Sequence, residues 1–162
     1  MSRDSVSGDP QQELRESLAR YRHIIENANE IIYRADHHGY FTYVNPAATR
    51  ITGYDEDELI GRHYLELIDP DYREAAAHFY THQFATHAAS TYFEFPMVAK
   101  SGVRIWMGQN VLTVLDEDRV VGYEAIARDI TERKGIEEEL ARTRDAALQS
   151  ARAKSEFLAN MS

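Results

Sequence analysis

The stretch Glu30–Asn45 reads EIIYRADHHGYFTYVN and sets the pattern for the whole domain. Isoleucine, tyrosine, phenylalanine and valine are enriched on both sides of His37-His38-Gly39, and such side chains favour extended backbone. Glycine gives the backbone the freedom that a tight turn requires. The stretch therefore predicts two short strands joined by a turn.

Strands return after residue 90 in three segments, namely Thr91–Ala99 (TYFEFPMVA), Val103–Leu115 (VRIWMGQNVLTVL) and Val120–Ile130 (VVGYEAIARDI). Ser101-Gly102 and Asp116–Arg119 separate these segments and predict two hairpin turns. Pro96 lacks the N–H group that a sheet ladder needs, so the first segment is expected at an edge of the sheet.

Capping signals fill the region between the two groups of strands. Asn45-Pro46, Asp55–Glu58 and Asp69-Pro70 each place a capping side chain at the start of a short helix. Helices gathered in one block between two groups of strands predict an α+β domain with an antiparallel sheet.

The two hairpin turns also predict which side chains share a face of the sheet. A two-residue turn at Ser101-Gly102 and a four-residue loop at Asp116–Arg119 put one set of mostly apolar residues together: Phe93, Phe95, Met97, Trp106, Gly108, Asn110, Leu112, Tyr123, Ala125 and Ala127. This face is the more apolar one, so we expect it to point at the helices.

Small side chains surround the polar Asn110 on this predicted face, which leaves room for a ligand cavity. The candidate pocket residues are Phe93, Phe95, Trp106, Asn110, Leu112, Tyr123, Ala125 and Ala127. In the alternative interpretation, Phe93, Phe95 and Trp106 fill the space themselves.

Amphipathic segments flank the domain on both sides. Residues 11–28 predict a helix with an apolar stripe at Leu14, Leu18, Tyr21 and Ile25, and residues 132–162 predict a helical linker with a seam through Ile136, Leu140 and Leu148. These stripes pack either onto their own domain or onto a second chain, and we expect a parallel homodimer. Residues 1–10 are small and polar and predict a disordered leader.

Composition excludes several classes of protein. The chain has 162 residues, a net charge of −9 and no cysteine. The acidic balance argues against a nucleic-acid-binding surface, and the lack of cysteine excludes disulfides and thiolate metal sites. No apolar run reaches the roughly 18 residues of a membrane-spanning helix. We therefore expect a cytoplasmic chain with no membrane contact. No nucleophile, base and oxyanion donor are arranged together, so we expect no catalytic site.

Three segments together resemble a PAS domain: YRADHHGYFTYVNPAA (Tyr33–Ala48), ITGYDEDELIGR (Ile51–Arg62) and YEAIARDITERK (Tyr123–Lys134). They occur in the family's order across most of the domain. The resemblance implies a PAS fold over residues 29–131, with a five-stranded antiparallel sheet in the order 2-1-5-4-3 and short helices on one face.

The last residues, AKSEFLANMS (Ala153–Ser162), resemble the start of the dimerisation helix of sensor histidine kinases. In that family the phospho-accepting histidine follows directly. The resemblance implies a sensory module that relays a stimulus to downstream kinase domains of the same chain in two-component signalling. The alternatives are a receptor with an occupied small-molecule or haem pocket, and a module that serves only protein–protein interaction.

The resemblance also bears on cofactors, although the ligand itself stays unknown. Ala76 stands where a haem ligand is expected, so haem is not expected, and Tyr64 stands where a flavin-adduct photoreceptor needs cysteine, which excludes that chemistry. His78 and His82 are four residues apart on one helix, a spacing that makes them weak metal-ligand candidates. We expect them to be solvated.

Signal relay is expected where the last strand meets the linker helix. Thr131 is predicted to cap that helix. The predicted register brings Arg104 diagonally across from Asp129, so we expect an Asp129–Arg104 ion pair. Such a pair would fix the angle at which the helix leaves the sheet.

Overall fold

The computed structural model describes residues 9–161, and five strands form its sheet. The strands are β1 (Ile31–Asp36), β2 (Phe41–Val44), β3 (Ser90–Val98), β4 (Arg104–Asp116) and β5 (Arg119–Asp129). All neighbouring pairs are antiparallel, in the order β2-β1-β5-β4-β3. The predicted α+β fold and strand order are confirmed, and Pro96 lies on an edge strand.

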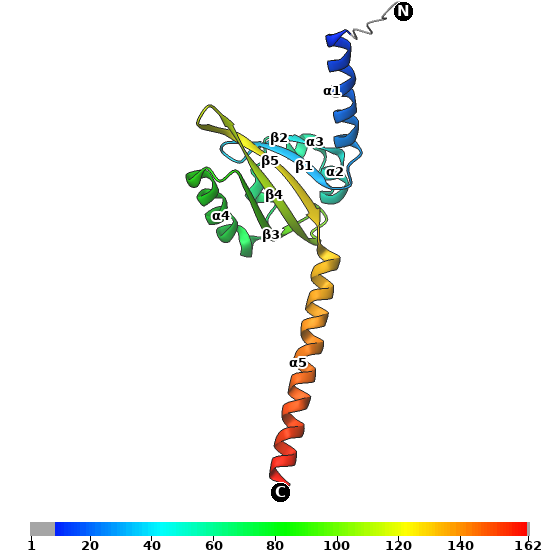
Figure 1. Ribbon diagram of the computed structural model, residues 1–162, viewed down its shortest axis with the longest axis vertical. Helices are drawn as coiled ribbons and strands as arrows, with labels where there is room; N and C mark the ends of the chain where they lie inside the picture. The colour runs from blue at the N-terminus through cyan, green and yellow to red at the C-terminus, as the bar shows by residue number, and fades with distance from the viewer. Residues whose placement is uncertain (1–8, 162) are drawn as a thin grey trace, which may run out of the picture.

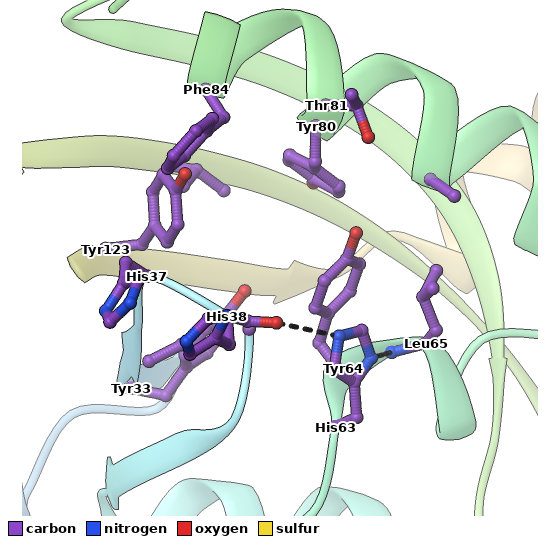
Figure 2. A pocket seen from close by; sticks show the side chains of 14 residues that line it. Tyr33, His37, His38, His63, Tyr64, Leu65, Tyr80, Thr81, Phe84 and Tyr123 are labelled. Carbon is purple, nitrogen blue, oxygen red and sulfur yellow. Dashed lines mark hydrogen bonds between the residues drawn. The ribbon is translucent and has the colours of Figure 1, made fainter. Parts of the chain in front are cut away.

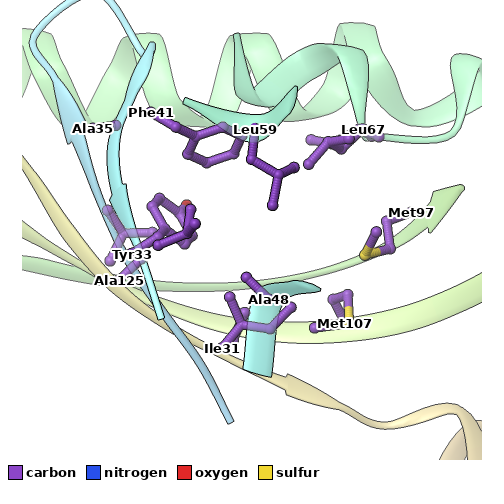
Figure 3. Packing of buried hydrophobic residues seen from close by; sticks show 14 of the residues in the cluster. Ile31, Tyr33, Ala35, Phe41, Ala48, Leu59, Leu67, Met97, Met107 and Ala125 are labelled. Atoms are coloured by element: carbon purple, nitrogen blue, oxygen red, sulfur yellow. The ribbon is translucent and has the colours of Figure 1, made fainter. Parts of the chain in front are cut away.

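Short helices occupy the chain between β2 and β3. They are α2 (Pro46–Thr52), α3 (Glu56–Leu59), the 3₁₀ helices η1 (Tyr64–Glu66) and η2 (Pro70–Tyr72), and α4 (Arg73–Thr86). Asp55 and Glu58 form the predicted capping box, and the Asp69 carboxylate accepts a hydrogen bond from the Asp71 N–H at 3.0 Å. Figure 3 shows the buried side chains that fill the space between these helices and the sheet.

Asn45 precedes α2 as predicted, but its side chain does not cap that helix. Its Oδ1 accepts from the Ile32 N–H at 2.9 Å, and its Nδ2 donates to the carbonyl oxygens of Ile25 and Glu30 at 3.1 and 3.0 Å. Asn45 is only 1% exposed, so its amide must satisfy its hydrogen bonds within the protein. The residue therefore joins the start of β1 to the chain that precedes it.

The register of β4 differs by one residue from the prediction in both of its hairpins. Val98 pairs with Arg104, so the β3–β4 loop spans residues 99–103 and is longer than a two-residue turn. Asp116 pairs with Arg119, which leaves Glu117 and Asp118 as a tight turn, and an irregularity follows between Val114 and Leu115. The two slips run in opposite directions: Phe95 faces Met107, one residue before the predicted Gly108, whereas Ala127 faces Gln109, one residue after it.

The consequence is that the predicted face is correct for β3 and β5 and wrong for β4. Side chains alternate along a strand, so a slip of one residue exchanges the two faces. Met107, Gln109 and Val111 are buried toward the helices. Their alternates, Trp106, Gly108, Asn110 and Leu112, lie on the outer face.

Two helices extend away from the body in opposite directions, α1 (Pro10–Glu26) and α5 (Thr131–Asn160) (Figure 1). Neither helix contains a buried residue. The predicted apolar stripes are exposed at Leu14, Leu18, Tyr21, Ile136, Leu140 and Leu148, whereas Ile25, the last predicted residue of the α1 stripe, is half-buried. Helix α1 ends two residues before the predicted limit, and the predicted disordered leader lies largely outside the described residues.

Candidate functional site

A cavity of about 270 Å³ lies between α4, the β1–β2 turn and the inner face of β4 and β5 (Figure 2). Four tyrosines line it, Tyr33, Tyr64, Tyr80 and Tyr123, together with three histidines, His37, His38 and His63. Its remaining walls are small, apolar or hydroxylated: Ala35, Gly39, Leu65, Ala77, Thr81, Phe84 and Val111. A small cavity with mostly aromatic walls and a few polar groups is the usual form of a small-molecule site.

The tyrosines of the cavity stay neutral at physiological pH. Burial raises the pKa of Tyr64 to about 12 and raises the pKa of Tyr33 and of Tyr80 well above the ordinary value. The Tyr80 hydroxyl accepts a hydrogen bond from the Gln109 side chain at 2.7 Å. The phenol groups can therefore donate hydrogen bonds without acquiring charge.

His63 links two segments at the edge of the cavity by hydrogen bonds at both of its ring nitrogens. Its Nδ1 accepts from the Leu65 N–H at 3.2 Å, so Nδ1 carries no proton. Its Nε2, which lies 2.9 Å from the carbonyl oxygen of His38, must then be the donor. A neutral imidazole thus connects the β1–β2 turn to the start of η1.

Gly39 makes this contact possible. It has φ +92°, and a Cβ at this position would lie 2.8 Å from the Tyr64 ring and 2.9 Å from His63 Nε2. Only glycine combines the left-handed backbone with so close an approach of two rings. The turn residue that was predicted from sequence therefore also shapes the cavity.

A second, smaller cavity of about 50 Å³ lies deeper in the core and shares Tyr33 and Tyr64 with the first. Of the predicted pocket residues, Tyr123 lines the larger cavity, and Phe95 and Ala127 line the smaller one. Phe93 and Ala125 lie on the inner face but line neither. Trp106, Asn110 and Leu112 lie on the outer face of the sheet and therefore cannot reach either cavity. They were assigned to the pocket because the predicted register of β4 was wrong by one residue.

Sequence reasoning missed Tyr33, Tyr64, Tyr80 and the three histidines as cavity residues. The available signal was the concentration of aromatic residues in the β1–β2 hairpin. Tyr64 and Tyr80 belong to the helical block, and no local pattern gives the position of that block over the sheet.

The predicted joint between the sheet and α5 is built from different contacts. Arg104 Nε pairs with Asp69 Oδ2 at 3.1 Å, whereas Asp129 Oδ1 accepts from the Thr131 N–H at 2.9 Å. The predicted Asp129–Arg104 ion pair is wrong, because Asp129 lies opposite Met107 in the sheet. Thr131 does not cap α5 either, since its hydroxyl accepts from the Trp106 N–H at 3.0 Å.

Glu94 on the outer face of β3 holds the first turn of α5 instead. Its carboxylate binds Lys134 Nζ at 2.6 Å, Arg133 Nη2 at 2.5 Å and the Tyr92 hydroxyl at 2.8 Å. Hydrogen bonds from Lys134 and Tyr92 lower the pKa of Glu94 to about 2. Lys134 Nζ also lies 4.9 Å from the centre of the Trp106 ring, within range of a cation–π contact. We call Glu94, Tyr92, Arg133, Lys134 and Trp106 the Glu94 joint.

The absence of a side chain at Gly108 leaves space for Tyr92 in the Glu94 joint. Gly108 pairs with Glu94 in the sheet, and a Cβ on Gly108 would lie 2.5 Å from the Tyr92 hydroxyl oxygen. The small residue that was predicted to open a cavity on the inner face therefore accommodates a tyrosine on the outer face.

The two histidines of α4 lie apart from the cavity. His78 and His82 are exposed, and within residues 9–161 no cluster of three metal-ligating side chains occurs. Ala76 is fully buried.

None of the helices in the described part of the chain is long and apolar enough to cross a bilayer.

Comparisons with known proteins agree with this architecture. Sporulation kinase C of Bacillus subtilis is 32% identical over 118 residues, which cover 72% of this chain and 27% of that protein. The cell-division control histidine kinase PdhS of Brucella anthropi is 27% identical over 160 residues, covering 95% of this chain and 15% of that protein. The chain thus spans about a quarter or less of the length of these relatives.

Solved structures show the same fold. The PAS domain of a Colwellia psychrerythraea protein superposes with a TM-score of 0.66 at 21% identity, over 72% of this chain and 98% of that one. A sensory box histidine kinase/response regulator from Burkholderia thailandensis gives a TM-score of 0.66 at 20% identity, over 80% and 98% of the two chains. The family model described as the PAS fold matches residues 19–130, and the chain therefore belongs to the PAS family.

Proposed function

We propose that this chain is a cytoplasmic, dimerising sensory module that relays a stimulus through α5 to a histidine kinase in two-component signalling. Its family and the kinase names of its relatives support a role in signal sensing. The kinase activity belongs to a larger parent protein in this proposal, since the described residues offer no arrangement of catalytic groups.

The Glu94 joint is the observation that carries the proposal. Residues of α5 make their contacts with the body through its first turn, where Arg133 and Lys134 bind Glu94. Strand β5 runs from Tyr123 at the cavity to Asp129 at the start of α5. Strand β5 leads into α5, and Glu94 of β3 binds the first turn of α5. A movement of β5 relative to β3 would therefore change the direction of α5, and a helical linker can transmit that change.

The exposed stripes on α1 and α5 support the dimerisation that we propose. Leu14 and Leu18 on α1 and Leu140 on α5 are between 57% and 69% exposed. Large apolar side chains repeated at helical spacing usually pack against a partner surface, so a monomer is not expected to leave such stripes exposed to water. The two helices extend from opposite ends of the body, so a parallel pair of chains can bury both stripes (Figure 1).

The relay is tested by measuring the direction of α5 in solution. Because the chain has no cysteine, Thr42→Cys on β2 and Ala147→Cys on α5 provide a unique pair of spin labels. Dilution with unlabelled protein restricts electron-spin distance measurements to pairs within one chain. We expect one narrow distance distribution, and a clearly broader one after Glu94→Gln.

Glu124→Gln is the matched control, since it removes an ion pair with Arg34 on the same face of the sheet but away from α5. This variant should keep the narrow distribution. Equal widths for the Glu94→Gln protein and the parent would overturn the proposed joint.

Dimerisation is tested by sedimentation at concentrations up to the high micromolar range. The double substitution Leu18→Glu and Leu140→Glu should weaken self-association at least tenfold, which is about 1.4 kcal/mol. Gln11→Glu with Gln149→Glu adds the same charge to the same two helices and should have little effect. A parent protein that stays monomeric throughout would contradict the proposal.

A further inference from the structure

We infer that the 270 Å³ cavity binds a neutral, one-ring aromatic molecule that carries a hydrogen-bond acceptor. This inference rests on the proposed sensory function and names the class of ligand that would provide its stimulus. Three properties of the cavity lead to it: the shape of its walls, the free donors on them, and the charges that they lack.

The walls suit an aromatic ring. Tyr64 and Tyr80 already meet edge to face, with ring centres 5.3 Å apart, and Phe84 stands 42% exposed at the cavity on the α4 side. A planar ring placed between such groups gains further edge-to-face and stacked contacts. The volume is somewhat below the range of about 300–1,000 Å³ that is usual for drug-sized ligands, so a single ring fits better than a fused system.

Two phenol groups are available as donors. Tyr64 and Tyr123 both line the cavity, and within residues 9–161 neither hydroxyl has a hydrogen-bond partner. Figure 2 shows both hydroxyl ends directed toward α4. Burial raises the pKa of each, so they remain protonated donors. A carbonyl or similar acceptor on the ligand would satisfy them.

The charge of the lining selects against ions. No aspartate, glutamate, lysine or arginine is among the residues that line the cavity. The remaining titratable side chains of the lining, besides the tyrosines, are His37, His38 and His63, and His63 Nδ1 accepts a hydrogen bond from the Leu65 N–H. An ionised ligand would lose its hydration without gaining a permanently charged partner from the lining, which is unfavourable.

The inference is tested with three small probes of similar size. Acetophenone is neutral and has an acceptor, benzoate is anionic, and ethylbenzene has no acceptor. Ligand-detected NMR titrations of the whole chain should show saturable binding of acetophenone and at least tenfold weaker binding of benzoate. Combining Tyr64→Phe with Tyr123→Phe should weaken acetophenone binding about tenfold and leave ethylbenzene binding unchanged, because only the hydroxyl groups are removed.

Ala77→Leu provides the test of location. Ala77 lines the cavity from a half-buried position on α4, so leucine fills the space on a helix that tolerates it. This variant should lose acetophenone binding and keep the thermal midpoint of the parent.

Benzoate binding as tightly as acetophenone would overturn the inference, and so would acetophenone binding that survives Ala77→Leu. Absence of acetophenone binding up to its solubility limit would overturn it as well. None of these outcomes affects the spin-label measurement on α5, which contains no ligand, so failure of the ligand site and failure of the relay can be told apart.

Discussion

Leu59 and Leu140 are the same amino acid in two opposite situations. Leu59, in the body, is 1% exposed, whereas Leu140, on α5, is 69% exposed. The body buries a contiguous cluster that includes Ile31, Phe95 and Met107, while α5 buries nothing along its 30 residues. The body is therefore shaped by tertiary packing, and α5 is shaped by local helix-forming preferences and by whatever holds its first turn.

Polar groups show the same contrast. In the body, Asn45 and Gln83 are buried and fully engaged, with Gln83 bonded to Val111, Thr113 and Thr91. Along α5 the charged groups are exposed, and exposed ion pairs contribute little stability. Among residues 9–161, charges of α5 meet a partly covered carboxylate of the body at the Glu94 joint alone, where the Glu94 side chain is 25% exposed. The geometry of α5 thus depends on very few contacts.

The largest expected effect is on the free energy of unfolding, and it compares a leucine of the body with a leucine of α5. Leu59→Ala should lower the free energy of unfolding by about 2–5 kcal/mol, because it leaves a cavity in a packed core. Leu140→Ala should change it by no more than about 0.5 kcal/mol when measured at a concentration where the chain is monomeric. Chemical denaturation of both variants compares them, and similar losses would mean that α5 packs against the body in solution.

A glycine pair sharpens the contrast with an intermediate effect. A Cβ on Gly122 would lie 2.6 Å from the Ala35 carbonyl oxygen, so Gly122→Ala should destabilise the body by about 1–3 kcal/mol. Gly135 on α5 has nothing within 4 Å of the corresponding position. Gly135→Ala should stabilise that helix by about 0.5–1 kcal/mol. Amide exchange around residue 135 should slow in this variant; faster exchange would contradict the open surroundings of Gly135.

The smallest expected effect is the pH dependence of the stability that the Glu94 carboxylate contributes. The pKa of Glu94 is lowered from 4.5 to about 2 in the folded chain, so its contribution is fully present above about pH 4.5 and is lost as the pH falls toward 2. The stability difference between the parent and Glu94→Gln should be below about 1 kcal/mol at pH 7 and should shrink over this range. Denaturant titrations from pH 7 to pH 2.5 measure it. A difference that grows toward low pH would refute the assignment of the carboxylate as the charged partner.

Much of the fold could be predicted because its signals are local. The β1–β2 hairpin, the Asp55–Glu58 capping box and the order of elements depend on residues close together in sequence. The register of β4 could not be predicted in the same way. Ser101-Gly102 is part of a longer loop, and the irregularity at Val114 shifts the pairing after a turn that itself looks ordinary.

The sites were predicted less well than the fold, for a physical reason. The cavity joins residues from the helical block to residues of β1, β4 and β5, and the Glu94 joint connects residues 94 and 134 across the sheet. Such contacts depend on the register of every intervening strand. A one-residue slip was therefore enough to replace Gln109 by Asn110 on the inner face and to suggest Arg104 as the partner of Asp129.

The bare length of α5 has a mechanical consequence. At about 1.5 Å per residue, a straight helix of 30 residues is about 45 Å long, whereas its first turn extends only about 5 Å. If the helix behaves as a rigid lever that pivots at its start, a sideways shift of about 1 Å at the end of its first turn becomes a displacement of roughly 9 Å at Asn160. The body can then remain almost unchanged while its far end moves by nearly the diameter of a helix.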